Sequence, residues 1–122
     1  MKRIYLSAAI PFLLGAAPGM DIETKNDLRC LIAVSSLAQS DDKTVAMAGL
    51  IGAQYFLGRI DGRVPTLDLE RALGDEVSTL RNLEVPALLQ SCGKQIEQRG
   101  RSLKEIGERI EKKETHSSSS SS

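Results

Sequence analysis

The 122-residue chain has almost none of the residues that most enzymes need for acid–base or nucleophilic work. It contains a single histidine, His116, no tryptophan, only two tyrosines and only two phenylalanines. A Ser–His or Cys–His pair requires a histidine inside the fold, and His116 precedes a run of serines. There is no HExxH motif, no cysteine cluster with zinc spacing and no glycine-rich phosphate loop. We therefore expect a non-enzymatic protein with no catalytic residue, no metal and no cofactor.

An excess of charge of one sign is also missing. Lys and Arg together number 16, as do Asp and Glu, and the two signs alternate along the chain. Binding to nucleic acid needs a basic stripe, and attachment to anionic lipid needs a basic cluster. The sequence therefore predicts no nucleic-acid partner and gives no electrostatic anchor for a membrane surface.

The first twenty residues show the three-part pattern of a signal peptide. Lys2 and Arg3 are followed by an uncharged apolar run over residues 4–17, and then by small residues. The run is shorter than the ~20 apolar residues that a membrane-spanning helix requires. We predict a signal peptide over residues 1–20, no stable membrane span after its cleavage, and a periplasmic or secreted protein.

The rest of the chain predicts one small domain and a tail. A helical domain is expected over residues 21–115, and the serine run makes residues 116–122 a predicted disordered tail. The domain holds both cysteines, Cys30 and Cys92. Cysteine pairs in exported proteins are commonly oxidised, so we predict a Cys30–Cys92 disulfide. This bond would stabilise the fold by roughly 4 kcal/mol in the chain-entropy model. Two separate buried thiols are the alternative if the chain is not exported.

Apolar residues recur at helical spacing in four segments. These segments are residues 25–39, 42–60, 66–82 and a last one that begins near residue 85. Gly62 predicts the end of the second helix, and Thr66 is a candidate cap of the third. Because the first segment is apolar around much of its circumference, it should be central. No segment shows the period-two pattern of a strand, so the predicted fold is all-α, a four-helix bundle-like domain stapled by one disulfide.

The last predicted helix carries a glycine in every seventh position. Gly93, Gly100 and Gly107 lie on one side of a helix, beside its apolar face. A stripe of small residues lets another backbone approach closely, so we predict that these glycines pack against the second helix. Ser102 and Glu105 have the spacing of a capping box, which leaves open a break of the helix at Gly100.

The segment over residues 55–63 is the most distinctive part of the chain. It holds both aromatic residues found after the signal peptide, together with two arginines and an aspartate. Aromatic rings stack on partners and arginines bind anionic groups. We predict a partner surface formed by Tyr55, Arg59, Asp61 and Arg63, and we expect substitution of the arginines to leave stability intact. The alternative is an ordinary helix end, with the aromatics in the core and Asp61 paired with an arginine.

The segments over residues 27–31, 54–63 and 67–70, together with Cys92, resemble small exported helical proteins of unassigned function from alphaproteobacteria. A looser resemblance, through the two-cysteine plan of Cys30 and Cys92, is to periplasmic acid-stress chaperones of the HdeA type. The first resemblance implies export and a helical two-cysteine body but no activity. We expect an interaction or envelope-maintenance protein with an unknown protein partner; the alternative is an HdeA-like acid-stress chaperone.

Overall fold

Four α-helices and one short 3-10 helix make up residues 20–120, the part of the chain that the computed structural model describes. They are α2 (Ile22–Leu37), α3 (Lys43–Arg63), α4 (Leu69–Thr79), η1 (Asn82–Glu84) and α5 (Val85–Ser120). No strand occurs in these residues, so the predicted all-α, bundle-like fold is confirmed. The predicted signal peptide lies outside the described residues, apart from Met20. Among the described helices, none has a stretch long and apolar enough to cross a membrane.

Aspartates set the beginnings of three helices. The Asp42 carboxylate accepts hydrogen bonds from the backbone N–H groups of Thr44 and Val45 at the start of α3. Asp21 caps α2 in the same way. Asp68 caps α4, where we had predicted Thr66 as the cap. The capping aspartates therefore determine where these helices begin. Apolar periodicity alone predicted starts that differ from the observed ones by one to three residues.

The prediction that Gly62 ends the second helix is wrong. The helix α3 continues through Gly62 to Arg63, and Val64 takes an extended conformation. Pro65 follows directly, and a proline disfavours helical backbone in the residue before it. The helix therefore ends because of the proline and not because of the glycine.

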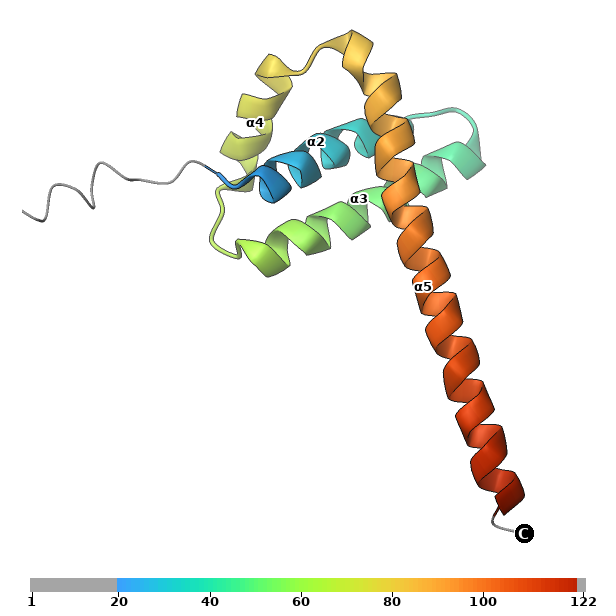
Figure 1. Cartoon of the computed structure of the whole chain (residues 1–122). Coiled ribbons are helices and arrows are strands. Elements are labelled where there is room, and N and C mark those ends of the chain that lie inside the picture. Colours follow the sequence, from blue (N-terminus) through green and yellow to red (C-terminus); the bar gives the residue numbers. More distant parts are fainter. Residues whose placement is uncertain (1–19, 121–122) are drawn as a thin grey trace, which may run out of the picture.

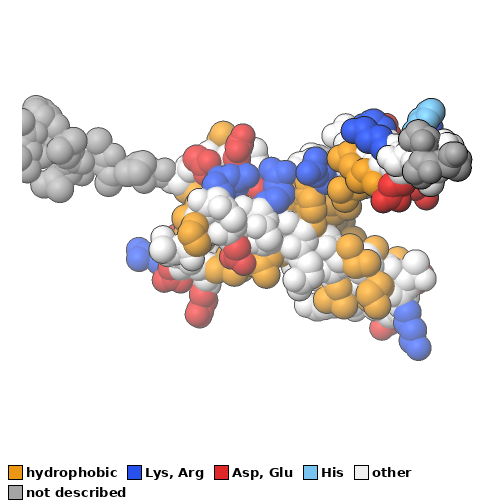
Figure 2. All heavy atoms as spheres, turned by 90° about the horizontal axis from the view of Figure 1, so that it is seen from below, with side chains coloured by type: hydrophobic (Ala, Val, Ile, Leu, Met, Phe, Trp, Pro, Cys, Tyr) orange, Lys and Arg blue, Asp and Glu red, His pale blue; other side chains and the backbone are white. Residues whose placement is uncertain are grey.

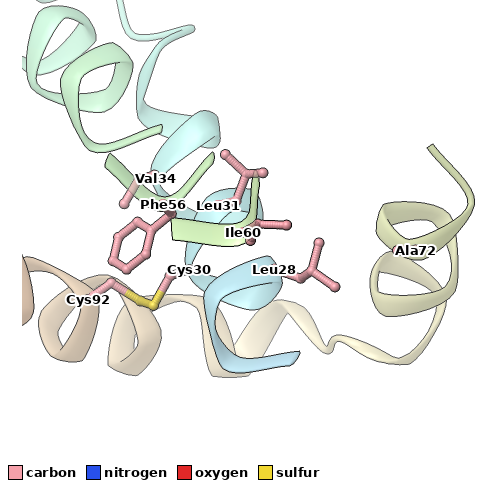
Figure 3. Packing of buried hydrophobic residues seen from close by; sticks show 8 residues of the cluster. All are labelled: Leu28, Cys30, Leu31, Val34, Phe56, Ile60, Ala72 and Cys92. Atoms are coloured by element: carbon pink, nitrogen blue, oxygen red, sulfur yellow. A yellow bond between two sulfur atoms is a disulfide. The ribbon is translucent and has the colours of Figure 1, made fainter. Parts of the chain in front are cut away.

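The helix α2 is the centre of the domain, as predicted. It contacts α3, α4 and α5 (Figure 1). Its apolar side chains form a core with residues of the other helices, shown in Figure 3. The buried members of this core are Leu28, Cys30, Leu31, Val34, Phe56, Ile60, Ala72 and Cys92. Since every other α-helix contributes to this one cluster, the described residues build a single small core around α2.

The predicted disulfide is present and lies inside this core. Cys30 of α2 and Cys92 of α5 are bonded across 62 positions of sequence, with their Cα atoms 5.6 Å apart. Both are buried, and Figure 3 shows the bond joining the two helices. The bond attaches the first turns of α5 directly to the central helix.

Two glycines of α3 allow it to approach α2 closely. A Cβ atom on Gly49 would lie 2.8 Å from the backbone oxygen of Val34 and 2.7 Å from the backbone nitrogen of Ala38. A Cβ atom on Gly52 would lie 3.3 Å from Val34 Cβ and from the Cδ1 atom of Ile96. The small residues of α3 thus pack against α2 and make room for α5.

The predicted packing of the α5 glycines is wrong. A Cβ atom on Gly93, Gly100 or Gly107 would meet no atom within 4 Å, because these residues face away from the other described helices. Their periodicity places them beside the apolar stripe but not on the part of it that the core covers. The helix is continuous through Gly100, so the break considered at that residue does not occur.

The helix α5 is much longer than the body of the protein requires. With a rise of ~1.5 Å per residue, its 36 residues span about 54 Å. Figure 1 shows its C-terminal half extending away from the other helices. The helix runs to Ser120, so the disordered tail predicted from residue 116 is wrong for the described residues. The hydroxyls of Thr115 and Ser118 donate to the carbonyls of Glu111 and Glu114, which satisfies them within the helix.

The contact at Gly49 predicts a large asymmetry between glycines. Gly49→Ala should lower the free energy of unfolding by about 1–3 kcal/mol, because the new methyl group overlaps backbone atoms of α2. Gly93→Ala is the matched control: in open space on a helix, it should raise the stability by up to about 1 kcal/mol. Urea unfolding followed by circular dichroism measures both. Equal stability of the two variants would contradict the close packing of α3 on α2.

Candidate functional site

The two arginines of the predicted partner surface point to a buried aspartate. Arg59 Nε and Arg63 NH1 each lie 3.0 Å from the same oxygen, Oδ2 of Asp27. Asp27 belongs to α2, and its side chain is 2% exposed. A carboxylate buried to this degree needs ionic partners and hydrogen bonds to remain charged. The arginines supply both, so they connect α3 to α2.

A threonine and a tyrosine complete this cluster. Arg63 NH1 donates to Oγ1 of Thr24, which is fully buried, at 3.3 Å. Arg59 NH1 donates to the hydroxyl of Tyr55 at 3.3 Å, and its guanidinium lies 5.7 Å from the centre of that ring. The hydrogen bond to Asp27, followed by that to Tyr55, holds the pKa of Arg59 above its ordinary value. The arrangement keeps Arg59 charged and fixed in place.

The sequence analysis placed the two arginines correctly on one helix but did not predict that Asp27 of α2 binds them. Tyr55, Arg59 and Arg63 are neighbours, as predicted, whereas the side chain of Asp61 is exposed and forms no hydrogen bond or ion pair among the described residues. The ion pairs with Asp27 argue against the expectation that the arginines are dispensable for stability, because the arginines neutralise this buried carboxylate. The available signal was Asp27 itself, a charged residue next to Leu28 on the apolar side of the first helix.

A second ionic cluster joins α2 to α4 and η1. Glu76 of α4 is largely buried, and its carboxylate lies 3.5 Å from Arg29 Nε and 3.7 Å from Lys25 Nζ. The other end of the Arg29 guanidinium binds Glu84 at 2.9 Å. Arg29 Nε and Glu76 Oε2 are buried and face each other without a hydrogen bond. This cluster, like that of Asp27, holds helices together.

No described part of the chain assembles reactive side chains. Within residues 20–120, no three His, Cys, Asp or Glu side chains gather where a metal could bind, and both cysteines are in the disulfide. A polar hollow of about 230 Å³ lies between α3 and α5. It is lined by Tyr55, Arg59, Gln95, Gln98, Arg99 and Ser102. Its hydroxyl, amide and guanidinium groups suit polar contacts with a partner molecule.

The longest run of exposed residues in the described part of the chain is the outer half of α5. Every residue from 103 to 119 is exposed. Three of these residues are large and apolar: the exposed fractions of Leu103, Ile106 and Ile110 are 58%, 39% and 53%. These residues continue the stripe that begins with Leu89, Cys92 and Ile96 inside the body. The side-chain hydrogen bonds of Thr115 and Ser118 and the ion pair between Lys104 and Glu108 lie within the helix. We call residues 97–119 the outer segment of α5.

A second apolar patch lies on α3. Met47, Leu50 and Ile51 are spaced to share one face of the helix, and each is at least half exposed. Figure 2 looks toward the end of α5 and shows hydrophobic side chains both on that helix and on the rest of the molecule. Exposed apolar groups of this kind, set among polar residues, are typical of interaction surfaces.

The Asp27 cluster predicts a clear difference between two carboxylates that bind the same arginine. Asp27→Ala should lower the free energy of unfolding by about 3–5 kcal/mol, because it leaves two partly buried arginines without their counter-charge. Glu23, which is 67% exposed and 3.6 Å from Arg63, is the control. Glu23→Ala should cost less than about 1 kcal/mol. Chemical unfolding measures both, and a mild effect of Asp27→Ala would show that the cluster is not structural.

Comparison with known proteins identifies no relative of this chain. No protein-family model matches the chain, and neither curated proteins nor solved structures show significant similarity to it. The resemblances to exported two-cysteine proteins and to HdeA-type chaperones are untested and stay predictions.

Proposed function

We propose that the protein is a non-enzymatic interaction protein of the cell envelope and that the outer segment of α5 is its binding element. One observation carries this proposal. The apolar stripe of α5 continues without a change of phase from the core into solvent, where Leu103, Ile106 and Ile110 are exposed.

The energetics of an isolated helix support this proposal. Helices of this length are marginal in water unless an apolar face is packed against something. The first turns of α5 are packed by the core and anchored by Cys92, but the outer segment has no such support. A binding partner that covers the stripe would supply it.

The disulfide and the signal-peptide pattern support an oxidising location. Disulfides persist in the periplasm and outside the cell, and glutathione and thioredoxin reduce most of them in the cytosol. We place the protein in the periplasm or among secreted proteins, which is where its partner would be met.

Photo-crosslinking in living cells tests the binding element. A photoreactive phenylalanine analogue at Ile106 lies on the stripe, and the same analogue at Thr115 lies on the opposite side of the helix. We expect a covalent adduct of higher mass from position 106 and little from position 115. Placing the analogue at Leu103 and Ile110 extends the scan. The proposal fails if none of the three stripe positions gives an adduct.

A second candidate function is that of an acid-stress chaperone, and the buried carboxylates favour it. Asp27 faces Arg59 and Arg63, and Glu76 faces Arg29 and Lys25. Protonation of both carboxyl groups would remove these ion pairs and leave the cations unbalanced. Loosened helices expose apolar surface that could hold unfolded proteins.

A client assay decides on this candidate. An acid-sensitive enzyme is brought to about pH 2, where carboxyl groups are protonated, with and without the purified protein. A chaperone should suppress light scattering by the aggregating client in acid, and should not do so at neutral pH. An unchanged scattering curve in acid would rule the chaperone function out.

A further inference from the structure

We infer that the outer segment of α5 pairs with the outer segment of a second copy of this chain, and that the two helices run antiparallel. This inference rests on the proposed function, because it names the partner of the same stripe. It follows from the position of the stripe, from the charges that interrupt it and from the charges that flank it.

The stripe has the spacing of a coiled-coil seam. Steps of three and four residues give a heptad pattern in which the core positions are called a and d. The a positions are Leu89, Ile96, Leu103 and Ile110, and the d positions are Cys92, Arg99, Ile106 and Lys113. Two helices of this kind bury their seams against each other by knobs-into-holes packing.

The body of the protein excludes a parallel pair. The inner stripe, through Cys92 and Ile96, faces α2 and α3, so the body lies on the same side of α5 as the seam. A second helix laid parallel and in register would bring its own body against the first body at the same level. It would also place Arg99 against Arg99 and Lys113 against Lys113 at the centre of the seam, where like charges repel.

An antiparallel pair avoids both conflicts. When Ile106 lies level with Ile110 of the second copy, two apolar layers form, and residues 97–119 of each helix overlap. Leu103 then packs on the aliphatic stem of Lys113, whose ammonium reaches solvent. Each body lies beyond the end of the other outer segment. This register uses all three exposed apolar residues of the stripe.

The flanking charges match in this orientation. At ~1.5 Å per residue, Lys104 lies about 3 Å along the axis from the level of Glu114 of the second copy, on one side of the seam. Glu105 lies about 3 Å along the axis from the level of Arg109 of the second copy, on the other side. The two-fold symmetry doubles each pair, and flanking pairs of this kind set the orientation of helices in coiled coils. The two copies of Gly107 lie within about 3 Å of each other along the axis, on the same side of the seam, so the backbones can approach closely there.

Sedimentation of the purified, oxidised full chain tests the pairing. We expect a monomer–dimer equilibrium at protein concentrations up to about 100 µM, a range in which weak interfaces assemble. Ile106→Lys should weaken association more than about tenfold, because it places a charge in both apolar layers. Thr115→Lys adds the same charge on the opposite side of the helix and should leave association unchanged. Circular dichroism of the variants confirms that each remains folded.

Two further variants test the orientation. Gly107→Cys should be joined to its copy by a short bis-maleimide, because the two positions meet in the antiparallel pair. Lys113→Cys should not be joined, because its two copies lie about 15 Å apart along the axis, at 1.5 Å per residue. The opposite result would show a parallel pair and overturn the inference. Lys104→Glu should weaken the dimer, and adding Glu114→Lys should restore it.

The outcomes separate this inference from the proposed function. A chain that remains monomeric at all concentrations overturns the self-pairing. If the photo-crosslinks at Ile106 then join a different protein, the proposed function stands and only its partner changes. If the purified chain dimerises equally with Ile106→Lys, the dimer uses another surface and the inference is wrong.

Discussion

The bond between Cys30 and Cys92 determines where the last helix goes. It lies in the core, and it joins the central helix α2 to the third turn of α5. Because it closes a loop across 62 positions, it stabilises the fold by roughly 4 kcal/mol in the chain-entropy model. Apart from this bond, α5 is attached to the body mainly by Leu88, Leu89 and Ile96. The direction of the outer segment therefore depends on a few residues around one covalent link.

The buried charge of Asp27 is the second constraint, and it changes the meaning of the nearby arginines. Arg59 and Arg63 would suit recognition of an anionic partner if they were free. Their guanidinium groups are instead directed at Asp27, with Thr24 and Tyr55 satisfying further donors. The cluster fixes α3 against α2 at one end, while Gly49 fixes it at the other. With the arginines bound to Asp27, the exposed apolar residues of α5 are a better candidate recognition surface than the arginines.

Most of the fold could be predicted from the sequence, and most of the site could not. Apolar periodicity located the helices, and the compartment implied by the signal-peptide pattern correctly paired Cys30 with Cys92. The ionic partner of Arg59, Asp27, lies 32 positions away, where no local pattern connects two residues. The spacing of Gly93, Gly100 and Gly107 predicted that they share one side of the helix. It could not predict whether another helix packs against that side, and none of the described helices does. Periodicity describes one helix at a time, so contacts between distant helices are outside its reach.

The length of α5 leaves the outer part of its stripe uncovered by the other described residues. A continuous helix cannot fold back on itself without a break, and α5 has none at Gly100, the residue best suited to one. The anchoring of Cys92 prevents the helix from sliding so that Leu103 or Ile106 would replace Ile96 against Gly52. The inner part of the stripe closes the core, and the same spacing leaves the outer part exposed to solvent. A helix with this regular seam is best covered by another helix, and the matching charges of the outer segment make a second copy a suitable one.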